Sequence, residues 1–249
     1  MGAVKNKNRM RKLLYILYQP YKWLFFFPFL IVNTLFFSLI GLLIALFSQK
    51  TGGYCGVVWA RLNAFLTPMF VKVTGRENIQ KNTSYIIVLN HQSYYDIFLI
   101  YGWIGIDIKW VMKMELRKIP GLGICCEKIG HIFIDRTNTQ VAIESMNKVK
   151  KKLVNGTSVV IFPEGTRSKT KELGAFKRGA FRLAFDLGLP ILPITLIGTK
   201  EILPSNMFNL LPGNAQMIIH KPVDINKYSL EEINTLMKDV SDIISAPLK

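Results

Sequence analysis

The sequence predicts an α/β fold, with a mixed or mostly parallel sheet flanked by helices and preceded by a membrane-embedded helical hairpin at the N-terminus. Beyond residue 75, short apolar runs alternate with helical patterns, which is typical of α/β domains. Residues 23–49 contain no charged side chain, and residues 1–76 carry ten basic residues and no acidic one. We therefore expect membrane-anchoring helices in residues 1–74 and one α/β domain in residues 75–249.

The N-terminal part is predicted to enter a membrane. As a helix, residues 23–49 would be roughly 40 Å long, which is enough to span a bilayer. Residues 54–71 form a second apolar helical pattern that contains Arg61, and residues 4–18 are expected to add a short interfacial helix. Because basic residues flank both apolar patterns, we expect the helices to enter and leave on the cytoplasmic face, a monotopic arrangement. Two full crossings are the alternative.

The elements of the second part are predicted in chain order from its apolar patterns. Strands are expected at residues 85–90, 106–112, 130–134, 158–162, 191–197 and 216–220. Helices are expected at residues 138–154, 175–187 and 229–245. The first of these helices begins with a capping box at Thr137 and Gln140. No internal repeat or low-complexity linker divides the sequence here, so this part is predicted to be a single domain.

The net charge indicates the kind of binding partner, and the cysteines indicate the redox compartment. A formal net charge of +16, with its basic and apolar N-terminal third, indicates the anionic cytoplasmic leaflet of a membrane rather than nucleic acid. Cys55, Cys125 and Cys126 show neither a disulfide framework nor the spacing of zinc ligands. We expect them to be free, buried thiols in a reducing compartment.

The stretch NHQSYYD, residues 90–96, places His91 at the C-terminal end of the first predicted strand and Asp96 five residues later. Ligands of α/β sheets bind at the carboxyl ends of strands. Two interpretations of Asp96 are open: it caps the following helix, as its spacing from Ser93 suggests, or it orients His91 as a general base. No nucleophile motif accompanies the pair, so the proton taken by His91 would come from a substrate hydroxyl.

A second polar stretch, FPEGTRS at residues 162–168, also follows a predicted strand. Pro163 and Gly165 predict a tight turn whose backbone N–H groups face a ligand. The guanidinium of Arg167 suits a phosphate, and Glu164 is expected to pair with Arg167 or to accept a hydrogen bond from a hydroxyl. A surface turn with an exposed ion pair is the alternative.

Two more candidate cations lie at predicted strand ends. The stretch GHIFIDR, residues 130–136, ends in Asp135 and Arg136. Arg136 is a candidate phosphate ligand, whereas Asp135 is expected to form a strand-end salt bridge and His131 to be structural. Lys113, directly after the second predicted strand, is the other candidate, with a solvated surface lysine as an equal alternative.

Together with ILPI at residues 191–194, these stretches resemble the four ordered sequence blocks of the glycerolipid acyltransferase family, in particular its bacterial 1-acyl-sn-glycerol-3-phosphate acyltransferases of the PlsC type. The resemblance spans residues 75–220. It implies transfer of an acyl chain from acyl-CoA or acyl-carrier protein to the sn-2 hydroxyl of lysophosphatidate, giving phosphatidate for phospholipid biosynthesis without a metal or redox cofactor. It also implies a catalytic role for His91 and Asp96, and substrate binding by Lys113, Arg136, Glu164, Gly165 and Arg167.

The expected mechanism uses His91 as the general base and forms no acyl-enzyme. Three rivals remain: a related acyltransferase for glycerol 3-phosphate or another lysophospholipid, a lipid phosphohydrolase, and a basic membrane-binding module without catalysis. The sequence lacks the paired carboxylates or His clusters of metal-assisted hydrolysis, and a binding module would leave both polar stretches unexplained. A catalytic domain on the cytoplasmic face of the inner membrane would meet both the lipid acceptor and the cytosolic donor.

Overall fold

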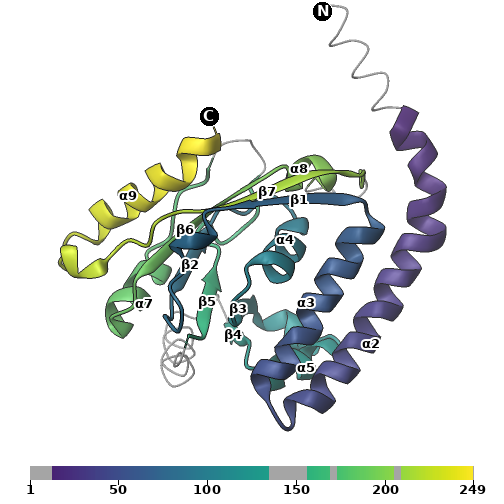
Figure 1. Cartoon of the computed structure of the whole chain (residues 1–249), viewed down its shortest axis with the longest axis horizontal. Helices are drawn as coiled ribbons and strands as arrows, with labels where there is room; N and C mark the ends of the chain where they lie inside the picture. The colour runs from purple at the N-terminus through teal and green to yellow at the C-terminus, as the bar shows by residue number, and fades with distance from the viewer. Residues whose placement is uncertain (1–12, 135–155, 169–172, 205–208, 249) are drawn as a thin grey trace, which may run out of the picture.

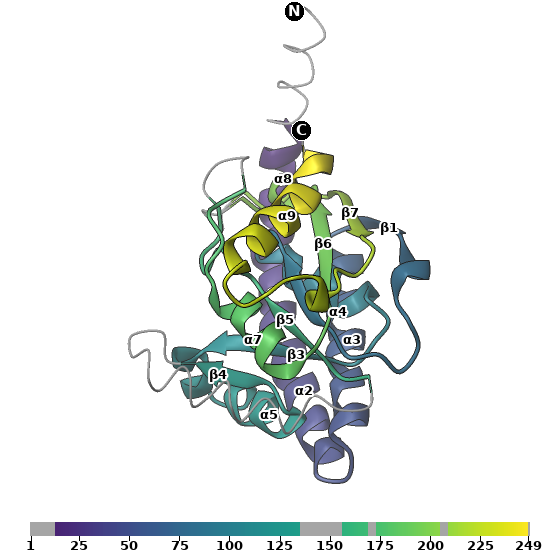
Figure 2. The same ribbon diagram turned by 90° about the vertical axis from the view of Figure 1, so that its left-hand side faces the viewer.

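The computed structural model describes residues 13–134, 156–168, 173–204 and 209–248. Within these residues, a seven-stranded sheet lies between two layers of helices (Figures 1 and 2). The strands are β1 (Met69–Thr74), β2 (Ile86–Leu89), β3 (Ile108–Lys113), β4 (Ile132–Ile134), β5 (Ser158–Ile161), β6 (Ile191–Ile197) and β7 (Gly213–Ile219). The α-helices are α2 (Phe27–Ala45), α3 (Gln49–Leu66), α4 (Tyr95–Trp103), α5 (Leu122–Ile129), α7 (Gly179–Leu187), α8 (Thr199–Ile202) and α9 (Ile233–Ser245). Short 3-10 or π segments are η1 (Lys22–Phe26), η2 (Arg76–Asn78), η3 (Met114–Lys118), η4 (Ile225–Lys227) and η5 (Ala246–Leu248).

The sheet is mixed, as the sequence predicts. Its strands lie in the order β1-β7-β6-β2-β5-β3-β4. The pair β6–β7 is antiparallel, and the other neighbouring pairs are parallel. Because β2 runs parallel to both β5 and β6, the carboxyl ends of these three strands meet at one edge of the sheet.

The central strand β2 is buried on both faces, which explains its uninterrupted apolar sequence. Ile87 and Leu89 point into a core shared with α4, whereas Ile86 and Val88 point into a second core shared with α7 and α9. The first core also includes Phe26, Ala60 and Ala64 from the helices of the N-terminal part. The strand that carries the NHQSYYD stretch is therefore anchored from both sides.

The six strands predicted from the sequence are all present, with boundaries shifted by up to three residues. The prediction of one helical pattern over residues 54–71 is wrong at its end. Helix α3 stops at Leu66, Pro68 follows, and Met69–Thr74 instead forms β1, which pairs with β7. Because proline cannot continue a helix, the chain turns there and joins the sheet. The expected boundary at residue 75 thus falls directly after the first strand.

Two of the three helices predicted for the second part lie within the described residues. Helices expected at 175–187 and 229–245 are present but begin later, at Gly179 and Ile233. The helix expected at 138–154 lies outside the described residues, as does most of the interfacial helix expected at 4–18.

The described chain begins with a continuous helix, Leu13–Ala45, which is long and apolar enough to cross a membrane. Its part α2 lies beside α3, to which residues 46–48 connect it (Figure 1). Helix α2 also packs against α5, and α3 packs against α4. Earlier in the same helix, Phe26 is buried in the first core and the Tyr21 hydroxyl donates to the Leu66 carbonyl at 2.8 Å.

The polarity of α2 is inverted relative to a helix of a soluble protein. Its buried residues are small or polar, namely Asn33, Ser38, Gly41 and Ala45. Many of its large apolar side chains are exposed, including Ile31, Val32, Leu35, Phe36, Leu39 and Leu43. An exposed apolar surface of this kind marks an interaction site for another apolar surface.

The cysteines are free and buried, as predicted. Burial raises the pKa of the Cys125 thiol to about 11 and that of the Cys126 thiol to about 12. Since the thiolate is the reactive form, these two cysteines are poor nucleophiles at neutral pH.

Candidate active site

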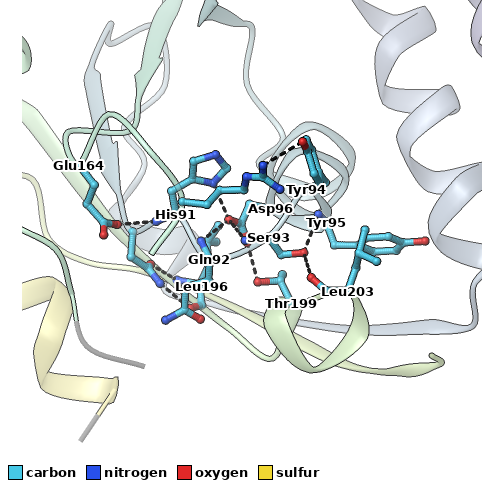
Figure 3. A network of polar contacts seen from close by, with 12 residues as sticks. His91, Gln92, Ser93, Tyr94, Tyr95, Asp96, Glu164, Leu196, Thr199 and Leu203 are labelled. Atoms are coloured by element: carbon cyan, nitrogen blue, oxygen red, sulfur yellow. Dashed lines mark hydrogen bonds and ion pairs between the residues drawn. The ribbon is translucent and has the colours of Figure 1, made fainter. Parts of the chain in front are cut away.

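His91 and Asp96 form a hydrogen-bonded pair at the carboxyl edge of the sheet (Figure 3). His91 follows β2, and Asp96 lies in the first turn of α4. The Nδ1 atom of His91 is 2.8 Å from Oδ2 of Asp96, with side-chain exposures of 16% and 0%. Because a carboxylate only accepts, Nδ1 carries the hydrogen and Nε2 remains as the proton acceptor of the ring.

The structure contains the contacts on which both sequence-based interpretations of Asp96 depend, and the role of His91 as a base stays a prediction. Its Oδ2 also accepts the backbone N–H groups of Gln92 at 2.7 Å and of Ser93 at 2.9 Å. The carboxylate therefore closes the turn that leads into α4 and holds the imidazole in the same contact. A negative charge at this helix N-terminus is further favoured by the helix dipole.

The His91 ring is positioned by stacking on its face as well as by the hydrogen bond at Nδ1. Phe162, directly after β5, stacks on the imidazole with 3.8 Å between ring centroids and 18° between planes. Trp110 of β3 stacks behind Phe162, with centroids 6.0 Å apart. The ring is thus fixed in orientation before any substrate binds, which is what a general base requires.

Glu164 connects the two polar turns through backbone contacts that the sequence did not predict. Its Oε1 accepts the backbone N–H of His91 at 2.7 Å, and its Oε2 accepts that of Gly174 at 2.8 Å. Among the described residues, no ion pair joins Glu164 to Arg167. Burial raises the pKa of the Glu164 carboxyl, against the two N–H groups, which lower it. Both oxygens are engaged by the backbone, so the carboxylate shapes the site.

The turn around Gly165 also differs from the expectation. Gly165 has φ = +75°, and its N–H donates to the Phe162 carbonyl at 3.1 Å, so this N–H closes the turn itself. A Cβ at this position would lie 3.0 Å from Nζ of Lys177. Lys177 is therefore an additional cation beside the turn, which the sequence analysis did not identify.

The structure describes two of the three predicted phosphate-binding cations. Arg167 packs on the ring of Tyr94, so the arginine of FPEGTRS reaches the turn that carries His91. Lys113 is the exposed last residue of β3, at the same carboxyl edge but with β5 between its strand and β2. Arg136 and its neighbour Asp135 lie outside the described residues.

His131 has the structural role expected from the sequence. It is buried, its Nε2 lies 3.3 Å from the Tyr101 hydroxyl, and its Nδ1 accepts the backbone N–H of Trp110 at 3.3 Å.

Two contacts, one with β6 and one with α8 directly after it, were not predicted. The side-chain amide of Asn90 donates to the Leu196 carbonyl at 2.9 Å and accepts the Leu196 N–H at 2.7 Å, which extends the β2–β6 pairing into the turn that carries His91. The Thr199 hydroxyl donates to Oδ1 of Asp96 at 2.5 Å. The available signal for Thr199 was a hydroxyl residue directly after a glycine at the end of a predicted strand.

Comparison with known proteins identifies the family. The sequence model of the Acyltransferase family matches residues 70–197, just over half of the chain, including β2, β5 and β6. A chloroplast 1-acyl-sn-glycerol-3-phosphate acyltransferase of Arabidopsis thaliana is 33% identical over 184 residues, which are 73% of this chain and 51% of that protein. A 1-acyl-sn-glycerol-3-phosphate acyltransferase of Limnanthes douglasii is 30% identical over 195 residues, 78% of this chain and 69% of the relative.

The chain thus spans only about half the length of the chloroplast relatives it matches. The crystal structure of the 1-acyl-sn-glycerophosphate (LPA) acyltransferase PlsC from Thermotoga maritima superposes with a TM-score of 0.78 at 29% identity, and the match covers 96% of both chains. This chain therefore belongs to the glycerolipid acyltransferase family.

Proposed function

We propose that this protein transfers an acyl chain from acyl-CoA or acyl-carrier protein to the sn-2 hydroxyl of lysophosphatidate, giving phosphatidate. The observation that carries the proposal is the oriented His91–Asp96 pair, with His91 partly exposed at the carboxyl edge and Asp96 fully buried. The names of the relatives support lysophosphatidate as the acceptor. A thioester donor and a histidine base are our additions.

In the proposed mechanism, Nε2 of His91 takes the proton of the sn-2 hydroxyl while the oxygen attacks the thioester carbonyl. The tetrahedral intermediate collapses and expels the thiolate, which takes the proton back from His91. Asp96 stabilises the positively charged imidazole between these two steps. The acyl group passes directly from the thioester to the hydroxyl, so no acyl-enzyme forms. None of the proposed steps uses a metal or a redox cofactor.

The phosphate of the acceptor would be held by cations at the same edge. Arg167 is the first of these, since its planar guanidinium suits a phosphate and lies on Tyr94, in the turn that carries His91. Lys113 and Arg136 remain proposed phosphate ligands. Glu164 and Gly165 are proposed to act by shaping the turns, because their polar groups are engaged by the backbone.

We further propose that the protein lies in the inner membrane as a monotopic protein, with its catalytic domain on the cytoplasmic face. The inverted polarity of α2 supports contact with lipid. Helices α2 and α3 both pack against helices of the catalytic domain, α5 and α4 respectively. A pair of helices attached in this way is suited to half-insertion and is poorly suited to crossing the bilayer away from that domain.

The test is thiol release from a long-chain acyl-CoA by the purified, detergent-solubilised protein. Lysophosphatidate, glycerol 3-phosphate and no acceptor are compared, each with wild type and His91→Ala. We expect release that needs lysophosphatidate and falls by about 10²- to 10⁴-fold in the variant. The same assay with acyl-carrier protein identifies the donor.

Each other outcome would change the proposal. Release only with glycerol 3-phosphate would replace the acceptor, and release of phosphate without thiol would indicate a hydrolase. An unchanged rate in His91→Ala would remove His91 from the mechanism. Vesicle binding without thiol release from either donor would leave a membrane-binding module.

A further inference from the structure

Thr199, the first residue of α8, contacts the proposed catalytic carboxylate from a part of the chain outside the polar stretches. Its hydroxyl donates to Oδ1 of Asp96 at 2.5 Å, and both residues are fully buried (Figure 3). This length is typical of a hydroxyl bonded to an ionised carboxylate. Among the described residues, the three other donors to Asp96 all bind Oδ2, and Thr199 alone binds Oδ1.

The backbone around Thr199 is built to hold it there. Gly198, between β6 and α8, has φ = +87°, and a Cβ at this position would lie 2.1 Å from the carbonyl oxygen of Asn214 in β7. Only glycine is compatible with this close approach. At the other end of α8, the Leu203 carbonyl accepts the Ser93 hydroxyl at 2.7 Å. Both ends of helix α8 are therefore hydrogen-bonded to the turn of residues 90–96, which carries His91 and Asp96.

We propose that Thr199 is a positioning residue of the acyl transfer, an inference that rests on the proposed function. Its hydroxyl fixes the rotation of the Asp96 carboxylate, so that Oδ2 stays directed at Nδ1 of His91. Without this donor, Oδ1 becomes a buried oxygen without a hydrogen bond, and the carboxylate turns about its Cβ–Cγ bond to recover one. His91 then loses the partner that holds its tautomer and its orientation.

The experiment compares Thr199→Val with Thr199→Ser in the thiol-release assay. Valine keeps the shape of threonine and removes the hydroxyl, whereas serine keeps the hydroxyl. We expect Thr199→Val to lower kcat by about 10- to 100-fold and to leave the KM for lysophosphatidate within about twofold. Thr199→Ser should retain kcat within about threefold. Thermal unfolding of each variant in the same detergent reports its folded fraction.

A second comparison separates positioning from a structural role. In a His91→Ala background there is no ring to orient, so adding Thr199→Val should change the residual rate by less than about twofold, measured with the enzyme concentration raised. A structural loss would lower the rate equally in both backgrounds. If the valine variant does not fold, Thr199→Cys replaces it, since a thiol is a weak donor of similar size and should give an intermediate kcat.

The outcomes also separate this inference from the proposed function. If His91→Ala is inactive but Thr199→Val turns over like wild type, the positioning role is wrong and the proposed function stands. If His91→Ala is as active as wild type, the proposed role of His91 fails, and the positioning role of Thr199 fails with it. Equal losses for Thr199→Ser and Thr199→Val would show that the hydroxyl is not the group that matters.

Discussion

The guanidinium carbon of Arg167 lies 3.6 Å from the centroid of the Tyr94 ring, and its Nη2 donates to the Tyr94 hydroxyl at 2.9 Å. Its Nη1 is buried and has no hydrogen-bond partner among the described residues. Tyr94 belongs to the turn between His91 and Asp96, and Arg167 belongs to the turn after β5. The proposed phosphate ligand is therefore positioned by the same short segment that carries the proposed base.

Tyr94 should set the affinity for the acceptor through this contact. A cation–π contact contributes about 0.5–1 kcal/mol at an exposed site, and a hydrogen bond to a charged group contributes about 1.5–3 kcal/mol. Tyr94→Leu should therefore raise the KM for lysophosphatidate by about 10- to 100-fold, with a smaller change in kcat. Tyr94→Phe keeps the ring and should lie between the two. Steady-state kinetics with varied acceptor measures this, and a KM of Tyr94→Leu equal to that of wild type would contradict it.

Glu164 should matter for turnover although it is not expected to contact substrate. In Glu164→Gln the amide nitrogen cannot accept a hydrogen bond, so one of the N–H groups of His91 and Gly174 loses its partner. An unpaired buried group costs about 1–3 kcal/mol, which we expect as a lower unfolding midpoint together with a lower kcat. Thermal unfolding and thiol release are measured on the same preparation. A variant with wild-type stability and a raised acceptor KM would instead place Glu164 in direct contact with the substrate.

His220 should make the stability of the fold depend on pH. Burial lowers the pKa of His220, so the unfolded chain binds a proton at a higher pH than the folded chain. The contribution of neutral His220 to stability is therefore present above the unfolded pKa and is lost as the pH falls through the lower folded pKa. Its Nε2 lies 2.8 Å from the Thr195 hydroxyl, which donates to the Ile244 carbonyl, so the neutral ring donates here.

The matched variant is His220→Gln, whose side chain keeps a donor and does not titrate. Between about pH 7.5 and pH 5, the unfolding midpoint of wild type should fall more than that of the variant. The difference between the two midpoints should therefore shrink as the pH is lowered. A difference that is constant across this range would show that His220 does not titrate differently in the folded and unfolded chains.

The exposed face of α2 should bind lipid. Leu35 and Leu39 are 52% and 58% exposed on this face. An aspartate inside a membrane-embedded helix costs about 2.5–3.5 kcal/mol, so Leu35→Asp with Leu39→Asp should lower partitioning into anionic vesicles by more than about 100-fold. Flotation of the full chain with vesicles measures the bound fraction. The control is Leu230→Asp, which alters an exposed leucine near the start of α9, and equal binding of all three proteins would refute lipid contact by α2.

Much of the sheet could be predicted because its central strands are buried on both faces. Ile86–Leu89 is a continuous apolar run, and Ile191–Ile197 is apolar except for Thr195, so both are visible in the sequence. Strand β1 was not predicted, since Met69–Thr74 follows an apolar helix with only a short break and is an edge strand of the sheet. Its assignment depends on its partner, β7, which is far along the chain.

In the site, too, contacts between residues close in sequence could be predicted, whereas contacts between distant segments could not. His91 and Asp96 are five residues apart, so one turn brings them together and the local pattern was sufficient. The contact of Glu164 with the backbone of His91 requires β5 to lie beside β2, and the contact of Thr199 with Asp96 requires β6 to lie on the other side. No strand order could be derived from the sequence, so these contacts were not accessible to it.

The attachment of the first helix has a consequence for engineering a water-soluble form of the protein. Phe26 fills part of the core, and Tyr21 satisfies the carbonyl at the end of α3. A chain shortened to remove this helix would have a hole in its core and an unpaired carbonyl, and it would be expected to aggregate. A water-soluble form is better sought by keeping the helix and replacing its outward leucines and phenylalanines with glutamate, lysine and glutamine, which preserve helix propensity.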